Sequence, residues 1–103
     1  TEELSPAERE RRSVRAGCNR LRDCRDRQIV SVRGTVEVLT LRSTGSTPVL
    51  EAELDDGTGV LTIVWLGRRH IPGIETGREI LVRGRISDTE GVRRIYNPWY
   101  QLV

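Results

Sequence analysis

The chain has 103 residues, of which 36% are hydrophobic and 31% are charged, and its formal net charge is +2. This length fits one domain with a single small core. No apolar stretch approaches the roughly 18 residues of a membrane span and no signal-like apolar region opens the chain, so we expect a cytoplasmic protein with no membrane contact.

The basic residues, all 17 of them arginine, are unevenly distributed. Residues 1–27 contain eight arginines and six acidic residues, whereas residues 28–103 contain nine of each. The second part is therefore neutral, which weakens a purely electrostatic argument for nucleic acid, because that affinity rests largely on Lys and Arg displacing counterions. The arginine bias itself fits either phosphate recognition or a GC-rich genome.

The first segment predicts a marginal amphipathic helix. Ser5 can cap it, Pro6 suits the first helical position and Glu8 can reach back to the Ser5 amide. The densely charged run from Arg20 to Arg27 fits a solvated linker, with a basic arm that contacts phosphates as the alternative. We therefore divide the chain into a helix and charged arm over residues 1–27 and a folded body over residues 28–103.

From residue 28 the hydrophobic pattern changes to period two, which predicts strands. Valines at positions 30, 32, 36 and 38 alternate with polar residues, and later segments alternate or are rich in β-branched residues. The pattern predicts a polar loop at 42–48, tight turns at 56–59 and 88–91, and an irregular connector at 66–76. The five predicted strands cover residues 28–38, 49–55, 60–65, 79–87 and 92–97.

Five short strands with a longer gap after the third predict a small closed barrel, because closure removes exposed sheet edges. Gly34 and Gly84 each end a Val-Arg-Gly triplet inside a predicted strand. Glycine within a strand marks a bend or a close approach of backbones, and a barrel needs such sharp coiling. The fold class that follows is all-β: a five-stranded barrel with an N-terminal α-helix.

Catalytic chemistry finds little support in the sequence. His70 is the only histidine, and the glycine spacings match neither phosphate-binding nor dinucleotide-binding loops. Glu51 and Glu53 share a strand face without a third partner, so a solvated face is the simpler interpretation. The spacing of Cys18 and Cys24 favours free thiols in a reducing compartment over a zinc site, and leaves a disulfide open. We expect no enzyme activity, no metal and no cofactor.

Four segments carry a resemblance to a known family: Val32-x-Gly34-x-Val36, residues 54–65 with their Asp-Gly-Thr-Gly turn, Gly77 with residues 80–84, and Asn97-Pro98-Trp99-Tyr100. Together they resemble an OB-fold domain of the nucleic-acid-binding type over residues 28–102, most closely the OB-type wedge domain of RecG-like DNA helicases. Motor and helicase motifs are absent from the sequence, and Trp65-Leu66 stands where two aromatic residues are expected. The resemblance implies an OB-fold that binds nucleic acid, with DNA favoured over RNA, and no branch-migration chemistry.

The candidate site combines aromatic rings with arginines. Three of the four aromatic residues lie within residues 96–100. Proteins that hold single strands stack bases on flat rings in grooves that also carry arginine, and OB-folds present strands 2 and 3 with two neighbouring loops. The predicted nucleic-acid-binding residues are Arg33, Arg42, Trp65, Arg68, Arg69, Arg94 and Tyr96.

Several of these features also have a purely structural interpretation. The position of Trp65 in its strand favours an inward side chain with a structural role. A structural role is favoured more strongly for Tyr100, and Trp99 could pack on the N-terminal helix. Glu51 and Glu53 would oppose a phosphate backbone on the outward strand face. The leading hypothesis is a non-catalytic protein that binds single-stranded or junction nucleic acid. The alternative is an OB-fold module that docks on another protein or on itself.

Overall fold

The computed structural model describes residue 5 and residues 18–103, so the predicted N-terminal helix lies outside the described residues apart from Ser5 and the stretch after residue 17. In the described part of the chain, the only helical element is a short 3-10 helix, η1 (Leu21–Asp23). The rest is strand and loop. The strands are β1 (Ile29–Thr44), β2 (Thr47–Asp55), β3 (Val60–Leu66), β4 (Glu79–Arg85), β5 (Ser87–Thr89), β6 (Val92–Tyr96) and β7 (Trp99–Leu102).

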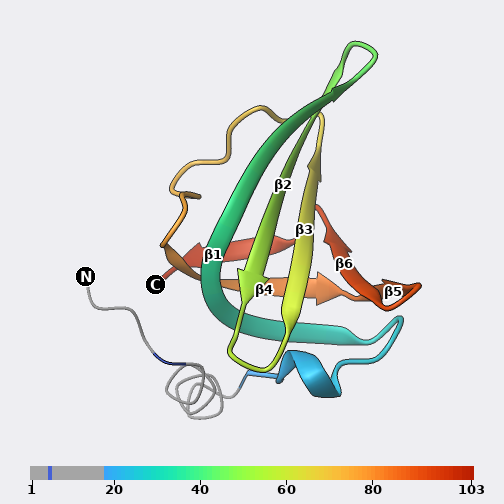
Figure 1. The fold of residues 1–103 in the computed structure, drawn as a ribbon, viewed down its shortest axis with the longest axis vertical. Helices are drawn as coiled ribbons and strands as arrows, with labels where there is room; N and C mark the ends of the chain where they lie inside the picture. Colours follow the sequence, from blue (N-terminus) through green and yellow to red (C-terminus); the bar gives the residue numbers. More distant parts are fainter. Residues whose placement is uncertain (1–4, 6–17) are drawn as a thin grey trace.

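These strands form one strongly curled sheet in the order β5-β6-β3-β2-β1-β4-β7, which wraps into a half-barrel (Figure 1). The long strand β1 makes the curl possible, because its first half pairs with β4 and its second half pairs with β2. All pairings are antiparallel except that of β3 with β6. The sheet is therefore open, with β5 and β7 as its two edge strands. The chain passes directly from β4, which lies next to one edge, into β5 at the other edge, and this connection brings the two edges towards each other.

The prediction of five strands is wrong in number, for identifiable reasons. The predicted strand at 79–87 divides into β4 and β5 at Ile86, whose buried side chain and two backbone hydrogen bonds to residues 27 and 28 bend the chain. The predicted loop at 42–48 is mostly strand, because β1 and β2 continue as a projecting hairpin that turns only at Gly45-Ser46. Strand β7 follows Asn97 and Pro98 and adds to the free edge of β4.

A bulge in β1 changes which residues face inward. Val36 pairs with Leu54 and Val38 pairs with Glu53, so Glu37 is an extra residue in the ladder. A bulge of this kind shifts the alternation by one residue and increases the local bend. Val38 therefore lies exposed on the outer surface, contrary to the plain alternation expected from the valines, and Leu39 takes the inner side.

The core lies between the front strands β1–β3 and the strands β4 and β6 behind them. Its fully buried members are aliphatic side chains from β1, β2, β3, β4 and β6, joined by Leu21 of η1. Connector residues Ile71 and Ile74 close one end, and Leu21 with Cys24 closes the other. The segment from residue 18 to residue 24 is therefore part of the packed body.

A buried carboxylate fixes this segment to the turn between β2 and β3. Asp56 has no exposed surface and accepts hydrogen bonds from the Leu21 amide at 2.8 Å, from the Thr58 amide and hydroxyl at 2.8 and 2.7 Å, and from the Gly59 amide at 3.1 Å. A buried charge is tolerated when its lone pairs are used in this way. The predicted Asp-Gly-Thr-Gly turn is confirmed, and its aspartate also anchors a distant segment.

Within the described residues, no helix has the length and apolar character needed to cross a membrane.

Candidate nucleic-acid interface

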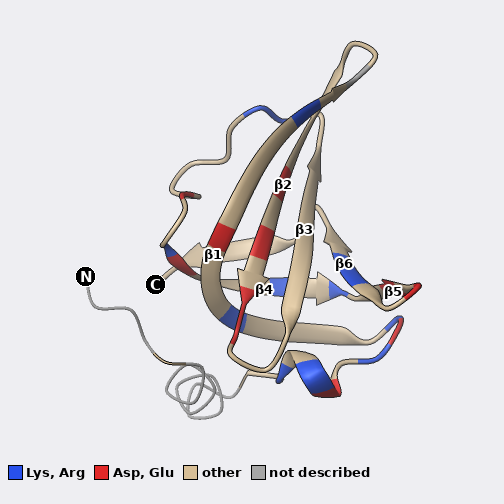
Figure 2. Cartoon of the chain, viewed as in Figure 1, with Lys and Arg blue, Asp and Glu red and all other residues tan. Residues whose placement is uncertain are grey.

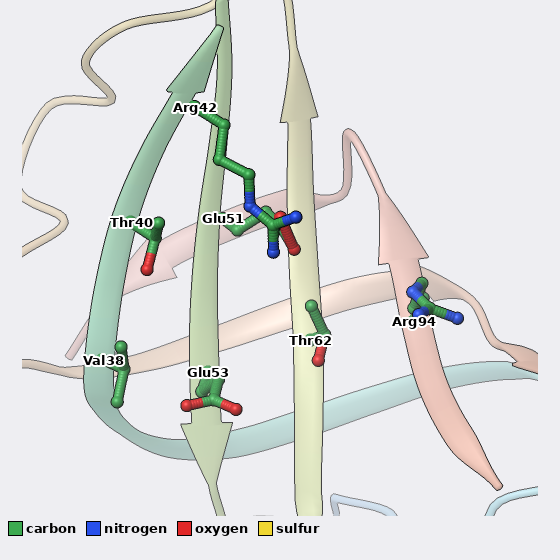
Figure 3. A pocket seen from close by; sticks show the side chains of 7 residues that line it. All are labelled: Val38, Thr40, Arg42, Glu51, Glu53, Thr62 and Arg94. Carbon is green, nitrogen blue, oxygen red and sulfur yellow. The ribbon is translucent and has the colours of Figure 1, made fainter. Parts of the chain in front are cut away.

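We call the outer surface of β2, β3, β6 and the second half of β1 the front face; of the predicted site residues, Arg42 and Arg94 lie on it. The register aligns side chains in rows across these strands, such as Val38, Glu53, Thr62 and Arg94. The face contains a shallow hollow of about 260 Å³ (Figure 3). Its lining residues are Val38, Thr40, Arg42, Glu51, Glu53, Thr62 and Arg94.

Charge on the front face is balanced. The Arg42 guanidinium lies 2.6 Å from the Glu51 carboxylate, while Glu53 and Arg94 occupy the same hollow. The hollow thus contains two guanidinium groups and two carboxylates, of which Arg42 and Glu51 form an ion pair. Glu51 and Glu53 lie on the surface where the sequence places them, and their charge offsets that of the predicted arginines.

Arg33 lies away from the front face. It projects from the first half of β1 beside β4, and its Nε donates to the Glu79 carboxylate at 2.8 Å, with each side chain 23% exposed. This ion pair joins residues 46 positions apart, so no short-range sequence pattern predicts it. The structure therefore separates Arg33 from Arg42 and Arg94.

Trp65 faces inward, as its strand position indicates. It is only 4% exposed, and its ring meets the edge of the Tyr100 ring with centroids 6.2 Å apart. A second hollow of about 260 Å³ lies over this pair and includes Arg68, while Arg69 is exposed on the same connector. The structure thus brings Trp65 and Arg68 together at one end of the half-barrel, away from the front-face hollow.

Tyr96 is half exposed on β6, opposite Val64 of β3, at the margin of the front face. It also lines a third and larger hollow of about 470 Å³, together with Arg27 and Arg85. Neither arginine was among the candidates. Their signal in the sequence is weak, because Arg27 lies in the presumed linker and only the curl of the sheet brings Arg85 of β4 beside Tyr96 of β6.

The described part of the chain has two thiols and no clustered metal ligands. No group of three or more His, Cys, Asp or Glu side chains is placed to hold a metal ion there. Cys18 and Cys24 are free thiols. Burial raises the pKa of both thiols above the ordinary value, an effect that Arg33 and Arg83 partly offset at Cys18 and Arg93 partly offsets at Cys24.

Comparison with protein-family models gives no match, and comparison with curated protein sequences gives none either. Among solved structures, the chain is similar to a part of RecG in a structure of RecG bound to a three-way DNA junction. The TM-score is 0.69 and the sequence identity 20%, over 81% of this chain and 12% of the RecG chain. This chain therefore corresponds to a small part of that protein, and the likeness supports the OB-like fold that the sequence predicts.

Proposed function

We propose that this protein is a non-catalytic OB-fold module that binds single-stranded or junction nucleic acid, with DNA favoured over RNA. The observation that carries the proposal is the fold shared with a part of RecG, a protein whose structure was determined on a three-way DNA junction. Exposed Tyr96 and neighbouring Arg94 on β6 add a ring for base stacking and a charge for phosphate, the two elements of single-strand recognition.

The predicted site residues contribute differently to this proposal. Arg68 and Arg69 are exposed on the connector, and Arg94 is partly exposed on β6. Arg42 is 63% exposed, and its pair with Glu51 can exchange for a phosphate at small cost, since exposed ion pairs contribute only about 0–1 kcal/mol. Arg33 is less available because its pair with Glu79 is largely covered. Buried Trp65 supports the hollow around Arg68 and does not serve as a stacking platform.

The affinity should be weak and sensitive to salt. The front-face carboxylates of Glu51 and Glu53 repel a polyanion, and few arginines are available to replace counterions. With about three phosphate contacts, the logarithm of the association constant should fall with the logarithm of salt concentration with a slope near −2, since each contact to a single strand contributes about −0.7.

Titration of labelled oligonucleotides with the full chain tests the proposal. Fluorescence anisotropy would follow a 15-nucleotide single strand, a three-way junction and a plain duplex at low and moderate salt. We expect micromolar binding to the first two at low salt and weaker binding to the duplex. No change in anisotropy at low salt with tens of micromolar protein would reject nucleic-acid binding.

One observation favours the alternative function, a protein-interaction module. The ion pairs of Arg42 with Glu51 and of Arg33 with Glu79 leave no unpaired arginine on β1 or β2, while Glu53 adds a further carboxylate to their outer surface. The double variant Glu51→Gln, Glu53→Gln separates the two functions. If the front face contacts nucleic acid, the loss of two negative charges should tighten binding several-fold. Binding of unchanged affinity would place the nucleic acid on another surface, and no binding before or after the substitutions would favour the interaction module.

A further inference from the structure

Arginines and exposed aromatic rings lie next to one another on the back of the half-barrel, which is the outer side of β4 and β7. Arg83 and Arg85 project from the same side of β4, because Gly84 between them faces inward against Ile95. Two residues along a strand correspond to about 6.7 Å. Trp99 of β7 lies opposite Arg83 in the register, and the Arg83 guanidinium carbon is 5.5 Å from the centre of its ring.

The hollow beside Tyr96 continues this arrangement from Arg85. Arg27 and Arg85 line it with the Tyr96 ring, and Ser87 and Thr89 contribute hydroxyl-bearing side chains. One carboxylate is also present, that of Asp26, whose Oδ1 accepts the backbone amide of Asp88 at 2.9 Å. We call the five residues Arg27, Arg83, Arg85, Tyr96 and Trp99 the back strip.

The arginines of the back strip differ from those of the front face in their partners. Among the described residues, Arg27, Arg83 and Arg85 form no salt bridge, and Arg83 donates a hydrogen bond to the Ser31 hydroxyl at 3.0 Å. On the front face, Arg42 pairs with the Glu51 carboxylate and Arg94 shares its hollow with Glu53. Figure 2 shows acidic segments on β1 and β2, with basic segments also on β1, and basic segments on β4 behind them. Tyr96 and Trp99 are 51% and 52% exposed, so both rings are accessible.

Resting on the proposed function, we infer that a single nucleic-acid strand follows the back strip rather than the front face. The phosphates of the strand contact Arg85 and Arg27. Its bases stack on the Tyr96 ring and on the Trp99 ring, which the Arg83 guanidinium also contacts. Arginine and aromatic side chains together are the recognition elements of single strands, and cation–π contact holds Arg83 in place for this. The carboxylates of Glu51 and Glu53 keep the strand off the front face.

A pair of matched charge variants tests the path. Arg85→Gln removes one charge from the back strip, and Arg78→Gln removes one from an exposed position just before β4 that lies outside every hollow described above. A labelled oligothymidine of 15 nucleotides is titrated with each full-length variant. We expect Arg85→Gln to weaken binding five- to tenfold and to reduce the salt slope by about 0.7, and Arg78→Gln to stay within twofold of the parent. Circular dichroism and thermal unfolding verify that both variants fold.

Intrinsic fluorescence supplies a second measurement, because one tryptophan is buried and the other lies in the back strip. We expect oligothymidine to quench the parent protein, and Trp99→Phe to lose the quenching while anisotropy still reports binding within about threefold. Quenching that persists in Trp99→Phe would contradict the inferred path.

The results distinguish the path from the function itself. One outcome rejects the back strip but leaves the proposed function standing: the parent protein binds, the Arg85→Gln and Arg78→Gln variants have equal affinity, and Arg94→Gln weakens binding. The strand would then cross the front face. If the parent binds no oligonucleotide at all, the proposed function fails and the path fails with it.

Discussion

At the scale of single residues, Asp56 shows how a turn residue can also hold the tertiary structure. A short acidic side chain after a strand is ordinary turn chemistry, and its bonds to the Thr58 and Gly59 amides are local. Its bond to the Leu21 amide spans 35 residues and lies in the buried interior. One carboxylate therefore satisfies polar groups from two parts of the chain.

We predict that Asp56→Ala lowers the free energy of unfolding by about 3 kcal/mol, because several buried donors lose their acceptor together. Urea unfolding followed by tryptophan fluorescence measures the change. Asp23→Ala is the matched control: its exposed pair with Arg20 should contribute at most about 1 kcal/mol. Equal midpoints for the two variants would contradict this role for Asp56.

The two Val-Arg-Gly glycines offer a sharper comparison. A Cβ on Gly34 would lie 2.6 Å from the Asp55 carbonyl oxygen, a backbone atom that cannot move alone. A Cβ on Gly84 would lie 2.7 Å from Cδ1 of Ile95, which can change rotamer. We predict that Gly34→Ala costs about 3 kcal/mol and Gly84→Ala about 1 kcal/mol in urea unfolding. A larger cost at Gly84 than at Gly34 would show that the Ile95 side chain cannot change rotamer to make room for the added methyl group.

The two thiols predict a loss of stability at alkaline pH. Burial raises the pKa of Cys18 and Cys24, so the unfolded chain releases these protons first as pH rises past about 8.5. The folded state then binds more protons than the unfolded state, and stability falls from that pH up to the raised pKa values. Urea midpoints at pH 7.5 and 10 should fall further for the parent than for Cys18→Ala, Cys24→Ala. Parallel declines would exclude the thiols as the cause.

At the scale of elements, the bulge in β1 decides what the front face presents. Before it, even-numbered residues such as Val36 face the core; after it, Val38 and Arg42 face solvent. Strand periodicity alone places Val38 inside, since an inserted residue leaves no mark on an alternating pattern. The hairpin that follows is longer than the sequence predicts, because the pairing of β1 with β2 continues as far as Thr44 opposite Thr47.

We predict opposite outcomes for two single-residue deletions on neighbouring strands. Deletion of Glu37 removes only the extra residue, so the inner and outer faces keep their residues and the protein still folds, at a cost of about 1–3 kcal/mol. Deletion of Glu53 from β2 turns buried Ala52 and Leu50 outward, and cooperative unfolding should be lost. Near-ultraviolet circular dichroism and urea unfolding compare them. A folded Glu53 deletion would show that the register tolerates slippage.

At the scale of the whole molecule, residues 18–24 complete the core from outside the sheet. Leu21 is fully buried, and Arg93 of β6 reaches the Arg22 and Cys24 carbonyl oxygens at 3.5 Å. We predict that Leu21→Ala lowers the free energy of unfolding by about 2–4 kcal/mol, while exposed Arg22→Ala changes it by less than about 0.5 kcal/mol. Urea titration of both full-length variants measures the difference. A small cost at Leu21 would show that the strands alone hold the core.

The amino-acid sequence by itself determined the all-β class, the position of most strands, the tight turn at residues 56–59 and the inward direction of Trp65. These properties depend on period-two alternation and turn chemistry, which act between near neighbours. The sequence also identified Tyr96 and Arg94 as candidates, because aromatic and basic residues are conspicuous in a chain with few rings.

Only the tertiary structure decided which charges neutralise one another and which surfaces meet. The pairing of Arg33 with Glu79, the extra strand β7 beside β4, and the gathering of Arg27, Arg85 and Tyr96 around one hollow all join residues remote in sequence. Such contacts depend on strand register and on the curl of the sheet, which the whole chain sets together by burying its apolar faces. A short-range pattern in the amino-acid sequence therefore does not predict these contacts.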